Sequence, residues 1–137
     1  MKNETETVLR ISEGRKLIAL FMGKVTHHPQ NIDGWKEQIL LEAPGENKKI
    51  HYPFGCLPPF DTKWEWLMPV VDKIEEDELN EIMIMPRRIY VNRGENFQSQ
   101  YQKGYDFKRG NKLKTLYNAV VDFIKWHNET QARGANS

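Results

Sequence analysis

The chain has 137 residues, of which 39% are hydrophobic and 28% are charged, and its formal net charge is +1. A chain of this size can bury a sufficient core as one domain, and a net charge near zero selects no class of partner. The single cysteine, Cys56, excludes an intrachain disulfide, and the polar N-terminal stretch lacks the apolar run of a signal peptide or a membrane span. We therefore expect a small soluble cytoplasmic protein that does not contact membranes.

The predicted single domain spans residues 13–130, between a flexible N-terminal lead at 1–12 and a frayed C-terminal tail at 131–137. Its first element is a short helix in EGRKLIALFMG, which carries a broad apolar face and stops at Gly23. Residues 24–35 are expected to form a loop, because a proline and an Asn-Ile-Asp-Gly cluster break both the helical and the strand period.

A β-hairpin is predicted next. Residues 35–41 and 48–52 flank the sequence APGEN, whose Pro-Gly pair suits a chain reversal. The segment PFGCLPPF at 53–60 has three prolines in eight residues and cannot join a central strand. It is expected to connect the hairpin to the helix that follows.

The helix predicted over residues 61–78 is the element around which the rest of the chain is organised. Thr62 is placed to cap its first turn, with Glu65 three residues further on. Pro69 predicts either a kink within this helix or a short turn followed by a new helix that starts at the proline. The apolar stripe expected to face the core follows helical spacing and consists of Trp64, Leu67, Val71 and Ile74.

After this helix, IMIMPRRIYV predicts a hairpin that turns at Pro86, with a single edge strand as the alternative. Residues 96–103 alternate in polarity like a strand with one wet face, between Gly94 and Gly104. A last helix is predicted from a cap at Asn111 as far as Glu129. These elements together predict an α+β fold, in which a small and mostly antiparallel sheet of about five strands is flanked by two or three helices.

Three segments resemble a known family. RKLIALFMG at 15–23, WEWLMPVVDKIE at 64–75 and LYNAVVDFIKWHNE at 116–129 are similar to segments of the phage α/β/α-sandwich domain family, which comprises small phage and prophage proteins of Bacteroides-type bacteria. The resemblance implies a compact sheet flanked by helices and an origin in a mobile element. It supplies no catalytic residues, and it covers about a quarter of the chain.

Charge is distributed unevenly along the sequence. Residues 61–81 contain eight acids and two lysines, whereas residues 86–114 contain eight bases and two acids. Two explanations are open: the two segments pair with each other and with solvent, or the second forms a functional basic surface.

The second segment also interleaves aromatic residues with its bases, a pattern that can stack nucleobases and neutralise phosphates. The alternative is that the same aromatics only fill the core. The residues predicted to contact an anionic ligand are Arg87, Arg88, Tyr90, Arg93, Tyr101, Lys103, Lys108 and Arg109.

Trp64 and Trp66 lie about 200° apart on a helix, so both cannot enter the same core. Trp66 is therefore a candidate interface residue, unless it covers the proline-rich connector.

No metal site and no cofactor are expected, because the histidines and Cys56 lack the paired spacing of zinc ligands. A buried structural role is expected for Cys56, since His51 is its one nearby candidate base.

The sequence leaves three functions to compare. The first is a non-enzymatic phage-derived accessory protein that binds a ligand or a protein partner, with a homo-oligomer left open. The second is a nucleotide or nucleic-acid binder that uses residues 87–114. The third is a small hydrolase built on Cys56 or on the acidic cluster, which the lack of a catalytic motif makes the weakest.

Overall fold

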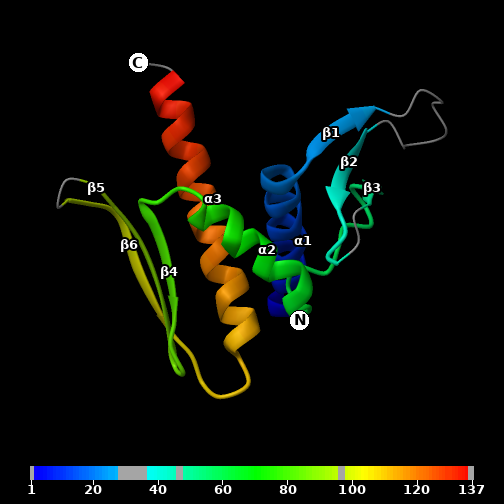
Figure 1. Cartoon of the computed structure of the whole chain (residues 1–137). Coiled ribbons are helices and arrows are strands. Elements are labelled where there is room, and N and C mark those ends of the chain that lie inside the picture. Colours follow the sequence, from blue (N-terminus) through cyan, green and yellow to red (C-terminus); the bar gives the residue numbers. More distant parts are fainter. Residues whose placement is uncertain (1, 28–36, 46–47, 96–97, 136–137) are drawn as a thin grey trace.

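The computed structural model describes residues 2–27, 37–45, 48–95 and 98–135 (Figure 1). Within this part of the chain, three helices and six strands follow one another in an α+β order, as predicted. The helices are α1 (Lys2–Met22), α2 (Trp64–Glu75) and α3 (Lys112–Ala135). The strands are β1 (Lys24–His27), β2 (Glu37–Glu42), β3 (Lys49–Pro53), β4 (Asn80–Ile84), β5 (Arg88–Glu95) and β6 (Gln98–Asp106).

The strands form two antiparallel sheets of three strands each, in the orders β1-β2-β3 and β4-β5-β6. The prediction of antiparallel pairing is confirmed, whereas the prediction of one sheet with about five strands is wrong. Strand β1 is the element that the sequence analysis missed, because a four-residue strand next to a proline-containing stretch has too few residues to show a period.

The layers are also arranged differently from the prediction. Helices α1 and α3 pack against each other, with β2 against α1 on one side and with β5 and β6 against α3 on the other. Figure 1 shows the two sheets on opposite sides of these helices, so the helices lie between sheets instead of flanking one sheet. Helix α3 can fill this position because it is apolar on two faces: Tyr117 and Val121 approach Gly14 of α1, while Phe123 contacts Tyr101 of β6.

Helix α2 crosses the helical layer and buries Leu67, Val70, Val71 and Ile74. It begins two residues after Thr62, because Lys63 N–H donates to the carbonyl of Pro59 in a preceding turn. The predicted cap at Thr62 is therefore wrong. Pro69 lies inside the helix, so no new helix starts at the proline.

Trp64, predicted to be buried, is 40% exposed. It is exposed because it is the first residue of α2.

Two hydrogen bonds stabilise the end of helix α1. The Gly23 N–H donates to Ala19 O, and Lys73 of α2 donates to Phe21 O at 2.6 Å. These two bonds satisfy carbonyls that the end of a helix leaves without partners.

Both predicted hairpins are confirmed: β2 pairs with β3, and β4 pairs with β5 around Pro86. Gly94 and Gly104 lie inside β5 and β6 and do not bracket a strand as predicted. Helix α1 begins at Lys2 and α3 continues to Ala135, so both include residues assigned above to the lead and the tail. None of the described helices has the length and apolar character needed to span a bilayer.

Candidate functional site

Two turns bring four of the predicted ligand-binding residues to one end of the β4-β5-β6 sheet. The β4–β5 turn carries Arg87, β5 begins with Arg88, and the β6–α3 loop carries Lys108 and Arg109. The two segments are joined because the Phe107 N–H donates to Arg87 O at 3.1 Å. The first turn of α3 adds two further bases to the same end. We call this surface the basic end; it consists of Arg87, Arg88, Lys108, Arg109, Lys112 and Lys114.

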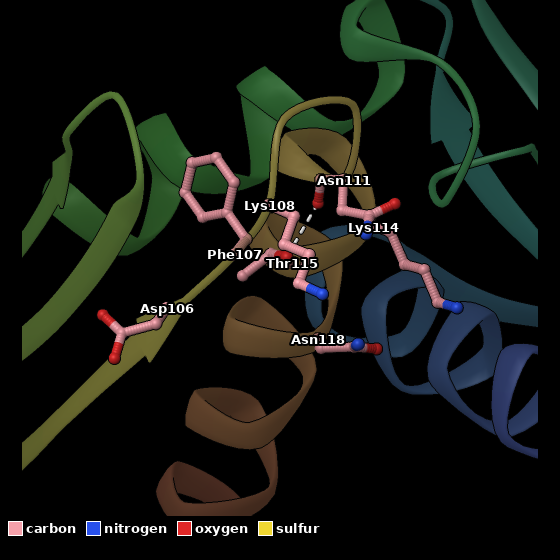
Figure 2. Close-up of a pocket in the computed structure, with 7 residues that line it drawn as sticks. All are labelled: Asp106, Phe107, Lys108, Asn111, Lys114, Thr115 and Asn118. Carbon is pink, nitrogen blue, oxygen red and sulfur yellow. Dashed lines mark hydrogen bonds between the residues drawn. The ribbon is translucent and has the colours of Figure 1, made fainter.

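A cleft of about 470 Å³ opens at the basic end, between the β6–α3 loop and the first two turns of α3 (Figure 2). Lys108 and Lys114 line it, together with the side-chain amides of Asn111 and Asn118. Thr115, which also lines the cleft, donates its hydroxyl to Asn111 O at 2.7 Å and thereby fixes the start of the helix. A volume of this size is within the range of small-ligand sites in proteins.

The lysines of the cleft are free to bind an anion. Within the described part of the chain, neither Lys108 nor Lys114 forms an ion pair. Among the described ion pairs, the one that involves a base of the basic end joins Arg88 to Asp106 at 3.8 Å, and the Asp106 side chain is 86% exposed. An exposed pair at this distance neutralises little charge, so the basic end keeps an excess of positive charge.

Two other predicted residues, Arg93 and Lys103, are committed to pairs elsewhere. Arg93 donates to Asp77 at 2.7 Å, to Asn80 at 2.8 Å and to Gln100 at 3.0 Å. The Arg93 guanidinium holds the pKa of Asp77 below its usual value. Lys103 donates to Asp122 of α3 at 3.1 Å. These two bases therefore stabilise the sheet and its contact with α3, and the structure separates them from the cleft.

Of the two predicted aromatic ligands, Tyr90 and Tyr101, only Tyr101 packs against the core. Tyr101 contacts Phe123 and Trp126, with ring centroids 5.5 and 5.1 Å apart. Tyr105 donates its hydroxyl to Asp122 at 2.8 Å, and burial together with this bond raises the tyrosine pKa. Tyr90 differs, because it lies between buried Ile89 and Val91 on β5 and so faces away from the helices.

Trp66, the candidate interface residue, is partly buried. Its ring makes edge-to-face contacts with Tyr52 at 6.0 Å and with Phe60 of the proline-rich connector at 5.8 Å. It also lines a mixed polar and apolar pocket of about 300 Å³, together with Leu41, Phe60 and residues of the β2–β3 turn. The tryptophan thus covers the connector and still presents part of its ring to this pocket.

The reactive side chains do not converge. Cys56 is exposed, so the prediction that it is buried is wrong: the tight turns of the connector hold it at the surface. His51, the candidate base, is also exposed, and its Nδ1 lies 3.1 Å from Thr26 Oγ1. Among the described residues, no three His, Cys, Asp or Glu side chains are placed to hold a metal ion.

The predicted ligand-binding residues do not include Asn111, Lys112, Lys114 or Asn118, and Asn111 is predicted only as a helix cap. The sequence does show the positive charge of two of them, since Lys112 and Lys114 belong to the basic segment 86–114. Their position could not be predicted, because the cleft depends on how the β6–α3 loop returns beside the helix (Figure 2).

The chain is an α+β protein in which two three-stranded antiparallel sheets enclose a helical layer, with a basic cleft at one end. No family profile, no curated protein and no solved structure matches it.

Proposed function

We propose that this chain is a non-enzymatic binding protein whose basic end holds the phosphate groups of a nucleotide or a nucleic acid. The observation that carries the proposal is the pair of cleft lysines, Lys108 and Lys114, which form no ion pair with the described residues and lie beside two side-chain amides. Ammonium groups bind phosphate as point charges, and the amides of Asn111 and Asn118 can donate hydrogen bonds to phosphate oxygens.

The proposal predicts a strong salt dependence. Each phosphate that a base neutralises releases bound counterions, so the logarithm of the affinity falls linearly with the logarithm of the salt concentration. With several bases at one end, retention on heparin is expected at low salt and is lost steeply as salt is added.

The test compares two double variants with the same change in charge. Lys108→Ala with Lys114→Ala removes the cleft lysines, whereas Lys48→Ala with Lys49→Ala removes two exposed lysines at the β2–β3 turn. The cleft variant should elute from heparin at lower salt and bind a labelled oligonucleotide with a salt slope smaller by about one per lost phosphate contact. The proposal is wrong if both variants lose the same affinity, since the effect would then be one of net charge alone.

A second candidate function is that of a cytoplasmic phage or prophage accessory protein that binds a protein partner. It is supported by the resemblance of the three segments and by the part of Trp66 that lines the pocket of about 300 Å³. Tryptophan in a desolvated pocket is a frequent anchor of protein interfaces. Light scattering and native mass spectrometry of the wild type and of Trp66→Ala would test it: a complex or oligomer that the variant loses supports this function, and a monomer without a partner in both contradicts it.

A further inference from the structure

The outer face of the β4-β5-β6 sheet is the face turned away from the helices. Ile89 and Val91 of β5 are fully buried beneath it, whereas its own residues alternate with them and are exposed or partly exposed. Helices α2 and α3 pack on the opposite face of this sheet (Figure 1). The residues of the outer face that matter here are Met83, Arg88, Tyr90, Asn92, Gln102 and Gly104.

At the centre of the outer face lies Tyr90, whose side chain is partly exposed. Its direct neighbour on β6 is Gly104, which contributes no side chain, and its neighbour on β4 is Met83, which is 40% exposed. Gln102 donates its amide to the Tyr90 hydroxyl, so the ring is directed toward β6. A ring held in this way can present one face to a planar ligand.

Arg88 connects this ring to the basic end. A Cβ atom added at Gly104 would lie 2.9 Å from Arg88 Nε and 3.0 Å from its Cζ, so the guanidinium lies flat against β6 in the space that the glycine leaves. Arg88 is also directly opposite Asp106, which lines the basic cleft. An aromatic ring, a flat guanidinium and a cluster of lysines therefore follow one another from the sheet to the cleft.

We infer that the outer face stacks an unpaired nucleobase on Tyr90 while the phosphates of the same strand lie at the basic end. This inference rests on the proposed function and narrows its ligand to single-stranded nucleic acid. The arrangement supplies what such a strand requires, namely cations for the backbone and an aromatic plane for a base. Asn92 and Gln102 add amide groups that can bond to base edges without demanding a particular sequence.

The test uses fluorescence anisotropy with two labelled probes of equal length and charge: an oligothymidylate and an oligonucleotide in which every residue is abasic. The wild type should bind the oligothymidylate about tenfold more tightly, since stacking on one aromatic side chain contributes roughly this factor. Tyr90→Leu should remove this preference and leave the affinity for the abasic strand unchanged, whereas Tyr90→Phe should keep the preference.

Gly104→Ala provides an independent check, because its methyl group would displace the Arg88 guanidinium, whose Nε and Cζ lie 2.9 and 3.0 Å from the added Cβ. It should weaken the binding of both probes by a similar factor. Circular dichroism and thermal unfolding confirm that each variant is folded before its affinity is compared.

The outcomes separate the inference from the function on which it rests. Equal binding of both probes by the wild type, with loss in the Lys108→Ala and Lys114→Ala double variant, overturns the base-stacking inference and keeps the phosphate site. Weaker binding of both probes by Tyr90→Leu also overturns the inference. Binding of neither probe by the wild type overturns both proposals together.

Discussion

Asp106 is the residue that most directly limits the charge of the basic end. Its side chain is 86% exposed and lies 3.8 Å from Arg88, so it contributes little to stability and opposes the approach of a phosphate. Asp106→Asn is therefore expected to raise the affinity for a labelled oligonucleotide at low salt by up to about fivefold, the factor for ~1 kcal/mol of exposed charge interaction. The control is Asp72→Asn, an exposed acid on α2 with the same change in charge. An equal gain in both variants would mean that the position of the acid is irrelevant.

Tyr105 sets a pH dependence of stability. Burial and the bond to Asp122 raise its pKa above the usual value near 10, so the unfolded chain loses this proton at a lower pH than the folded protein. The contribution of Tyr105 to the free energy of unfolding should therefore be constant below about pH 10 and fall as the pH rises above it. Tyr117 has a raised pKa for the same main reason, its burial.

Tyr105→Phe should consequently remove about half of this alkaline loss, because one of two comparable groups no longer titrates. The measurement is urea unfolding at a series of pH values between neutrality and the alkaline range. An unchanged slope in the variant would show that Tyr105 is not the group that titrates.

At the scale of elements, α3 is the helix that joins the layers. Phe123 is 1% exposed and contacts both Tyr101 of β6 and Trp126 of its own helix. Phe123→Ala should lower the free energy of unfolding by about 3–5 kcal/mol, since it removes a buried ring and leaves a cavity. Lys125→Ala, two residues further along on the exposed side, should change it by less than about 0.5 kcal/mol. Equal effects in chemical denaturation would contradict the placement of α3.

The elements that the sequence predicted well have strong local signals. Helix α3 has apolar residues at helical spacing over several turns, and the turns at Pro-Gly and Pro86 mark both hairpins. The failures occur where a signal is short or ambiguous. The hydroxyl of Thr62 suggested a cap, but the Thr62 and Lys63 N–H groups both donate to Pro59 O and form a turn before the helix. Strand β1 was too short to show an alternation of polarity.

At the scale of the whole molecule, the sequence could not reveal how the strands are divided between sheets. Alternation shows that a strand has a buried face, but not which helix covers it. Nothing in the polarity pattern of β2 and β5 assigns them to different sheets. They belong to different sheets because α1 and α3 lie between them. The candidate site was predicted in composition only: the sequence identified the basic segment, whereas folding divides it into paired bases in the sheet and a group at one end.

The most direct test of phosphate binding at the basic end is an NMR titration of the isotope-labelled protein with an oligothymidylate at low salt. Phosphate binding there predicts saturable amide shifts in the β6–α3 loop, in the first turns of α3 and at Arg87. Stacking of a base on the outer face predicts further shifts at Tyr90 and Gln102. Shifts confined to the pocket beside Trp66, or no shifts at any concentration, would contradict the claim that phosphates bind at the basic end.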